Sequence, residues 1–310
     1  MPSKDHIAEF LDHLLSEARC SPLTVEAYRR DLRQFFEFCS DSTESPDADH
    51  ATPRDIRAWI GTLADQGNEA ATLRRKLQSL RAFYKYGMKT GRSGHNPARD
   101  VTLPKKKKRL PGFIKEQDME EILSECGDTF ESMRRHIATE LIYTLGLRRA
   151  EVLALTDADV HARKAQTGEI SEAGEIRITG KRNKTRILPL PFRLSADIVR
   201  WQQIRDERYP QLQPPRPLIA GPHGSISANT LHNIVRDALS GTSSSKKSPH
   251  TLRHTFATTM INNGADLDAV REILGHASLS TTQIYTHLSV NELMAGYRLA
   301  HPRGALKPKS

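Results

Sequence analysis

Apolar residues recur at helical spacing through the first hundred residues of the chain. In residues 7–15 they fall every three or four positions, on one face of a helix, and three later stretches repeat this pattern. Ser21 and Thr52, each followed by proline, are typical of helix starts, and Gly67 is typical of the position after a helix end. The pattern predicts four helices, over residues 7–18, 21–39, 52–67 and 68–91.

The pattern becomes mixed from residue 113 onward. Two short runs, 174–180 and 185–191, flank the turn KRNK and predict a β-hairpin. The stretch 161–174 before the first strand is expected to be a surface loop. Helical patterns precede and follow the hairpin, so we expect a mainly α fold with a small β-hairpin or sheet. The expected helices in this part cover residues 116–126, 133–147, 151–156, 195–210 and 227–241.

Prolines and a run of cations separate the two parts of the chain. The stretch NPARDVTLPKKKKRLPG holds three prolines and ends in glycine, which is typical of a linker. The sequence therefore predicts an N-terminal helical domain over residues 1–100, a basic linker over residues 101–112 and a second domain over residues 113–310.

Charge adds a candidate partner to this picture. The chain of 310 residues has a formal net charge of +9, and its distribution is uneven. Residues 1–69 hold seven Lys or Arg against 14 Asp or Glu, whereas residues 70–110 hold 13 Lys or Arg against one acid, Asp100. Such a one-sided stripe suits phosphate neutralisation, since each cation placed on a phosphate releases condensed counterions. The alternative is a solvated face that serves solubility.

Two groups of cations make up the predicted DNA-binding stripe. The first lies on one face of the fourth helix, and the second is the linker run, which also resembles a nuclear-localisation patch. The members are Arg74, Arg75, Lys76, Arg81 and Lys85 in the helix and Lys105, Lys106, Lys107, Lys108 and Arg109 in the linker.

Other features narrow the cellular setting. The sequence contains no run of 18 apolar residues, so no membrane span is expected. The N-terminus lacks the basic segment followed by an apolar segment that is found in a signal peptide. Three cysteines, Cys20, Cys39 and Cys126, show no metal-ligand spacing and are too few for a disulfide framework. We expect a cytoplasmic protein.

Candidate chemistry gathers between residues 248 and 287. His250 and His254 are four apart, as zinc-binding histidines are on a helix, but no third ligand follows at a helpful spacing, so no metal site is expected. Phosphate chemistry suits these residues better. The guanidinium of Arg253 matches two phosphate oxygens, His250 can donate or shuttle a proton, and Tyr285 offers a hydroxyl nucleophile. This set is consistent with metal-free phosphoryl transfer to a tyrosine.

The motifs HTLRHTFATTM, LGHASLSTTQIYTH and YTLGLRRAEVLAL, with ITGKRNKTRILPL, resemble the catalytic boxes of the tyrosine site-specific recombinases, or phage integrase family. The likeness is greatest to the Xer branch and extends to the helix TVEAYRRDLRQFFEF near the N-terminus. The resemblance implies a SAM-like helical core-binding domain followed by an α+β catalytic domain. It also implies that no cofactor and no metal are required.

The resemblance assigns roles to particular residues. Tyr285 would form a 3′-phosphotyrosine, Arg148 and Arg253 would hold the scissile phosphate, and Lys181 would protonate the departing 5′-hydroxyl. His250 and His276 would complete the set, and Glu151 would support its neighbours. Arg182 stands where the family has a small residue, which leaves open whether Lys181 or Lys184 reaches the leaving group. The predicted catalytic residues are Arg148, Lys181, His250, Arg253, His276 and Tyr285.

Three functions remain open at this point. The first is resolution of chromosome dimers at division, with a paralogous recombinase in a tetrameric, two-plus-two complex on double-stranded DNA and an FtsK-type septal translocase. The second is integration of a mobile element, and the third is a DNA-binding architectural protein without catalysis. The tail, with Leu293, Met294 and Tyr297 at helical spacing, is expected from the resemblance to dock into a neighbouring subunit rather than onto its own domain.

Overall fold

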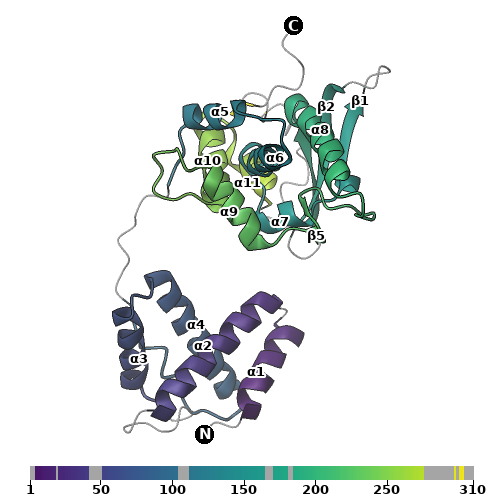
Figure 1. The fold of residues 1–310 in the computed structure, drawn as a ribbon. Coiled ribbons are helices and arrows are strands. Elements are labelled where there is room, and N and C mark those ends of the chain that lie inside the picture. Colours follow the sequence, from purple (N-terminus) through teal and green to yellow (C-terminus); the bar gives the residue numbers. More distant parts are fainter. Residues whose placement is uncertain are drawn as a thin grey trace. The chain divides into compact units, whose positions relative to one another are not determined.

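The computed structural model describes residues 4–18, 20–41, 51–103, 112–164, 170–180, 184–275, 297 and 300–303. The chain divides into two compact units, Met1–Arg109 and Leu110–Ser310, which we call unit 1 and unit 2. The fold is mainly helical with small antiparallel sheets, as the sequence predicted (Figure 1). No helix in the described ranges is both long enough and apolar enough to cross a bilayer.

Unit 1 is a four-helix array with an aromatic core. Its helices are α1 (Lys4–Ser16), α2 (Pro22–Asp41), α3 (Pro53–Asp65) and α4 (Ala70–Lys89). Thr52 caps α3 through a reciprocal pair of hydrogen bonds with Asp55, which satisfies two amide groups that a helix start leaves free. Gly67 has φ of 82°, so this position after α3 favours glycine. The four predicted helices are confirmed.

Unit 2 is built around one buried helix. It contains α5 (Glu116–Ser124), α6 (Phe130–Leu145), α7 (Arg149–Ala154), the 3₁₀ turn η2 (Asp157–Asp159), α8 (Phe192–Arg208), α9 (Ala228–Ala238), α10 (Pro249–Asn262) and α11 (Leu267–Leu274). Figure 1 looks along α6, which lies at the centre of unit 2 among α8, α9 and α10. Every residue of α6 from His136 to Leu145 is buried, so α6 forms the core against which the other helices pack.

A three-stranded antiparallel sheet flanks this helical core. Its order is β1 (Val160–Lys164), β2 (Ile170–Thr179) and β3 (Thr185–Leu190), and α8 packs against β2. A second, two-stranded sheet pairs β4 (Ala220–Gly221) with β5 (Gly224–Ser225). The predicted hairpin is confirmed as β2 and β3.

The prediction of a surface loop over residues 161–174 is wrong for residues 161–164 and 170–174, and residues 165–169 lie outside the described residues. Most of β1 and the first half of β2 lie in this stretch and pair with each other. The strand VHARK lies at the sheet edge and is largely polar, so no alternation of apolar residues marks it. A sequence signal is present at Gly174, where a Cβ would collide with the carbonyl oxygen of His161 on the neighbouring strand.

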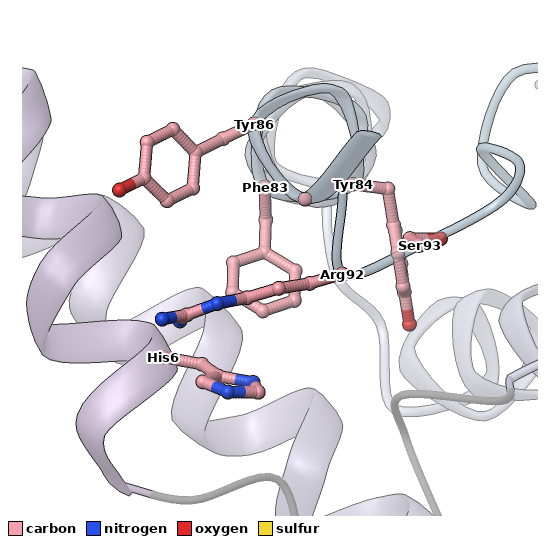
Figure 2. Close-up of a pocket in the computed structure, with 7 residues that line it drawn as sticks. His6, Phe83, Tyr84, Tyr86, Arg92 and Ser93 are labelled. Carbon is pink, nitrogen blue, oxygen red and sulfur yellow. The ribbon is translucent and has the colours of Figure 1, made fainter. Parts of the chain in front are cut away.

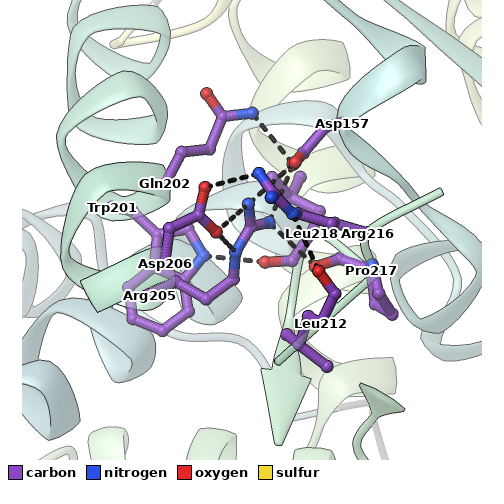
Figure 3. A network of polar contacts seen from close by, with 9 residues as sticks. All are labelled: Asp157, Trp201, Gln202, Arg205, Asp206, Leu212, Arg216, Pro217 and Leu218. Atoms are coloured by element: carbon purple, nitrogen blue, oxygen red, sulfur yellow. Dashed lines mark hydrogen bonds and ion pairs between the residues drawn. The ribbon is translucent and has the colours of Figure 1, made fainter. Parts of the chain in front are cut away.

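A buried arginine joins α8 to the loop that follows it (Figure 3). Both terminal nitrogens of Arg205 donate to the carboxylate of Asp157 at 2.7 Å, and Nη1 also donates to the carbonyl of Pro217 at 2.9 Å. Asp206 accepts from Arg205 and from Arg216, which extends the network to the chain before β4. The Trp201 indole donates to the carbonyl of Leu218 at 2.7 Å beside it. These contacts fix the side of unit 2 that carries η2.

A histidine between two carboxylates joins α6 to α8. Nε2 of the buried His136 lies 2.9 Å from Glu140 and 3.3 Å from Asp197. Burial lowers the pKa of His136, but the hydrogen bonds to Asp197 and Glu140 outweigh it and raise this pKa to about 9. The imidazole is therefore protonated at neutral pH and acts as the counter-ion of both acids.

His136→Gln is expected to lower the free energy of unfolding by on the order of 3 kcal/mol at pH 6.5, and by less as the pH rises. The folded pKa lies above the unfolded value of 6.5, so the stabilisation is full below pH 6.5 and is lost as the pH approaches 9. Melting temperatures of wild type and variant between pH 6 and 9.5 should converge. His223→Gln, which removes an exposed imidazole, should change neither the melting temperature nor its pH dependence. A gap that stays constant across this range contradicts the assignment.

Candidate active site

The turn between α6 and α7 places Arg148. Gly146 ends α6 with φ of 62°, and a Cβ there would lie 2.5 Å from the Phe256 ring and 2.9 Å from Leu274. Glycine is therefore required both by the backbone conformation and by the close approach of α10 and α11. The tight turn brings Arg148, the residue that precedes α7, towards both of these helices.

Glu151 is the centre of the polar cluster. The residue is 4% exposed, and its carboxylate accepts from the backbone amide of Arg148 at 2.8 Å and from its Nη1 at 2.7 Å. Arg186 of β3 donates to both carboxylate oxygens at 3.0 Å. Burial raises the pKa of Glu151, but the hydrogen bonds from Arg186 and Arg148 outweigh it and hold this pKa below its usual range. Glu151 is therefore ionised at neutral pH.

Arg253 enters the same cluster from α10. Ser248 caps this helix, because its hydroxyl accepts from the amide of Thr251 at 3.2 Å. Arg253 is 8% exposed and donates to the carbonyls of Gly146 and Leu274. Burial, together with the nearby Arg148, lowers its pKa to about 10, so the guanidinium remains charged at neutral pH.

The cluster carries an excess of positive charge. Arg148, Arg186 and Arg253 bring three positive charges against the single negative charge of Glu151, which leaves two in excess. Buried cations need a counter-ion or hydrogen-bond acceptors. An anion with several oxygens, such as a phosphodiester, suits this environment because guanidinium groups donate to paired oxygens.

The structure brings together three of the seven predicted catalytic and supporting residues: Arg148, Glu151 and Arg253. His250 is exposed in the first turn of α10, three residues before Arg253. Lys181, His276 and Tyr285 lie outside the described residues. Their flanking glycines are informative, because a Cβ on Gly180 would lie 3.4 Å from Glu151 Oε1, and the carbonyl of Gly275 accepts from Arg148 at 2.9 Å. The chain therefore passes the cluster immediately before Lys181 and immediately before His276.

Arg186 is a member of the cluster that sequence reasoning missed. Its signal lies in the alternation of TRILPL, because Arg186 shares an inward face with the buried Leu188 and Leu190 whereas Ile187 points outward. An arginine at an inward strand position needs an acidic or carbonyl partner. That partner could not be read from the sequence, because Glu151 is 35 residues away.

The predicted basic face of α4 is only partly exposed. Arg74, Arg75 and Lys85 are exposed, and Arg75 pairs with Asp31 of α2. Arg81 is half-buried and donates to the carbonyls of Ala98 and Val101 at 3.0 and 2.8 Å. Arg81 therefore holds the segment after α4 in place, and the linker run 105–109 lies outside the described residues.

The prediction that Lys76 belongs to the exposed face of α4 is wrong. Lys76 is 8% exposed, and its ammonium donates to Asp31 at 3.1 Å and lies 5.6 Å from the centre of the Trp59 ring. Its stem is long enough to bury its methylenes while its charge meets an acid from α2. Lys76 thus has a structural role inside unit 1.

Unit 1 contains a pocket of its own. It is lined by residues of α1, α4 and the turn after α4, including His6, Phe83, Tyr86 and Arg92 (Figure 2). Phe83 is also a core residue that packs edge-on against Phe10, with ring centres 5.6 Å apart. The pocket is a recess at the margin of the aromatic core, and none of its lining residues belongs to the predicted catalytic set.

The described part of the tail packs within unit 2. The Tyr297 hydroxyl donates to the carbonyl of Thr144 at 2.7 Å, and its ring stacks on His301. Arg303 donates to Glu140 at 2.8 Å. The expectation that Tyr297 docks into a neighbouring subunit is therefore wrong, because this residue is buried in its own unit. Leu293 and Met294 lie outside the described residues, so docking into a neighbour stays a prediction for that part of the tail.

One group of residues in the described ranges has a geometry that could hold a metal ion. Ligand atoms of His136, Glu140 and Asp197 lie within 4.8 Å of one another. A metal ligand must be neutral imidazole, whereas the raised pKa of His136 favours the imidazolium. This group is better explained as an ion-paired link between α6 and α8.

Known proteins share both parts of this chain. The profile of the phage integrase family matches residues 112–292, and that of the phage integrase N-terminal SAM-like domain matches residues 7–91. Tyrosine recombinase XerC of Pelobacter propionicus is 37% identical over 97% of each chain. Tyrosine recombinase XerC of Chlorobaculum tepidum is 33% identical over 96% of this chain and 94% of its own. Tyrosine recombinase XerD of Listeria innocua is 33% identical over 96% of this chain and 99% of its own.

Solved structures share the fold at lower identity. XerH recombinase, in a post-cleavage complex with a palindromic difH substrate, matches with a TM-score of 0.68 at 21% identity over 96% of this chain and 90% of its own. A lambda integrase tetramer bound to a Holliday junction matches with a TM-score of 0.61 at 15% identity, over 99% of this chain and 79% of its own.

Proposed function

Because the chain belongs to the phage integrase family, as a tyrosine recombinase that cuts and rejoins DNA, we propose that it resolves chromosome dimers at cell division. Near-full-length similarity to proteins named XerC and XerD supports this role. In this role it acts on a double-stranded recombination site together with a paralogous recombinase, in a complex of two plus two subunits. An FtsK-type septal translocase is the expected activator.

The proposed reaction is a transesterification. The Tyr285 hydroxyl attacks the scissile phosphorus, the bond to the 5′-oxygen breaks, and a 3′-phosphotyrosine forms. Lys181 gives a proton to the departing 5′-oxygen, which leaves as the 5′-hydroxyl, while His250 and His276 bind the phosphate and accept the proton that Tyr285 loses. A 5′-hydroxyl from the partner duplex then attacks the phosphotyrosine and reseals the strand, so no external energy source is needed.

The arginine cluster around Glu151 is the observation that carries this proposal. Arg148 and Arg253 are held beside each other with a net positive charge, where a phosphorane would gain negative charge in the transition state. Donors fixed in advance cost little reorganisation during the reaction. The two arginines therefore supply electrostatic stabilisation without a metal.

Covalent trapping tests the proposed function. The protein is incubated in EDTA with a nicked duplex that carries the host dimer-resolution site, and adducts are resolved on a denaturing gel. Wild type and Tyr209→Phe should form the adduct, whereas Tyr285→Phe should form none. Binding without an adduct, with the paralogue present, would support an architectural protein. An adduct on the ends of a mobile element but not on the dimer-resolution site would support an integrase.

A further inference from the structure

Three consecutive carbonyl groups at the end of α11 each accept from a different arginine. Arg186 Nε donates to Ile273 at 2.8 Å, Arg253 Nη2 donates to Leu274 at 2.7 Å, and Arg148 Nη2 donates to Gly275 at 2.9 Å. The last carbonyls of a helix lack partners within the helix, and its negative dipole end attracts cations. The position of this helix end is therefore fixed by arginines from three separate elements.

Arg186 differs from Arg148 and Arg253 in the groups to which its guanidinium donates. Its side chain is 14% exposed, and both terminal nitrogens contact Glu151 at 3.0 Å in a two-pronged pair. Its Nε is occupied by Ile273. The guanidinium fork that would bind a phosphate is thus already engaged by a buried carboxylate.

The position of Arg186 links two segments that lead to predicted catalytic residues. Arg186 lies at the start of β3, five residues after Lys181, and its contact with Ile273 lies three residues before His276. Through Glu151 it also contacts the group that orients Arg148. One side chain therefore connects the hairpin, the end of α11 and the Arg148 turn.

We propose that Arg186 is a positioning residue for strand cleavage: it holds Glu151 in a two-pronged pair and fixes the end of α11, and it does not bind the phosphate. This inference rests on the proposed roles of Arg148, Arg253 and Tyr285. Misplacement of reacting groups by about 1 Å can cost about 100-fold in rate. Arg186 therefore acts on the rate of the chemical step rather than on DNA affinity.

Arg186→Gln and Arg186→Lys test this role against the control Arg177→Gln. Arg177 lies on the neighbouring strand β2 and pairs with Asp159, away from Glu151. At saturating DNA, Arg186→Gln is expected to slow covalent adduct formation about 100-fold. Arg186→Lys should recover only part of this loss, since one ammonium cannot make the paired contact and the carbonyl contact together. Arg177→Gln should cleave as wild type does.

Two further readouts separate positioning from phosphate binding. Removal of a phosphate contact lowers the slope of log affinity against log salt concentration by about 1, whereas Arg186→Gln should leave this slope unchanged. Among the described residues, the charged groups that face Glu151 are Arg148, Arg186 and Arg253, so the loss of Arg186 raises the pKa of Glu151. The cleavage rate of Arg186→Gln should consequently fall more steeply at mildly acidic pH than the wild-type rate does.

Hydrogen exchange without DNA decides the proposal even where the chosen duplex is not cut. The peptide that contains residues 267–275 should exchange faster in Arg186→Gln than in wild type, while the melting temperature of Arg186→Lys stays near that of wild type. Unchanged exchange in this peptide overturns the proposal. A lower salt slope with a normal rate at saturating DNA also overturns it and makes Arg186 a phosphate ligand. Failure of wild type to form an adduct instead counts against the proposed function alone.

Discussion

Glu151→Gln is expected to abolish detectable strand cleavage and to lower the free energy of unfolding by about 3–5 kcal/mol. The amide keeps the size of the carboxylate but removes its charge, so Arg148, Arg186 and Arg253 lose their shared counter-ion. One end of the amide can accept a hydrogen bond, while the other presents N–H groups to a guanidinium that also donates. Repulsion among the arginines then shifts Arg148 and Arg253 from the positions proposed to hold the phosphate.

Cleavage and stability must be measured separately to interpret this variant. Glu140→Gln is a matched control, because Glu140 is equally buried in unit 2 and bonded to an arginine, Arg303, outside the cluster. It should lose stability yet form the adduct at temperatures where it is folded. The pKa of Glu151 is held below its usual range, so its stabilisation is complete above about pH 4.5 and is lost as the pH falls below that value. Normal cleavage by Glu151→Gln would show that the carboxylate does not organise the arginines.

Sequence reasoning succeeded where local rules decide the structure. Helical spacing, the cap at Thr52 and the pairing of β2 with β3 are encoded within a few residues, and all appear in the structure. Family motifs likewise led to Arg148, Glu151 and Arg253. These residues are recognisable because their neighbours in sequence form fixed patterns.

Sequence reasoning failed where a distant partner decides the environment of a side chain. Lys76 was expected on an exposed face because its acidic partner inside unit 1, Asp31, is 45 residues away and could not be recognised from the sequence. Arg186 was missed because its carbonyl partner, Ile273, is 87 residues away. A lysine or arginine looks identical in a sequence whether its side chain binds DNA, a carboxylate or the carbonyls of a helix end. Only the tertiary fold distinguishes these three environments.

The role of Arg205 was also missed, because its partner Asp157 is distant in sequence. Arg205 lies at the centre of a second arginine network (Figure 3). Replacement of Arg205 should lower the free energy of unfolding about as much as Glu151→Gln does. Arg205 is fully buried and contacts the carboxylates of Asp157 and Asp206, which are themselves partly exposed. Arg205→Met preserves much of the side-chain volume but leaves Asp157 without its counter-ion and Asp206 with Arg216 alone. We expect a loss of about 3–5 kcal/mol in the free energy of unfolding.

Urea unfolding followed by tryptophan fluorescence measures this loss in unit 2. The chain has two tryptophans, so a Trp59→Phe background leaves Trp201, which lies beside Arg205, as the reporter. Adding Asp157→Asn and Asp206→Asn to Arg205→Met should restore part of the stability, because the penalty comes from unpaired charge and not from lost volume. Equal stability of the single and triple variants would instead attribute the loss to packing around Trp201. Because the network lies outside the Glu151 cluster, folded Arg205→Met should still cleave DNA, which separates the residues that stabilise unit 2 from those that organise its chemistry.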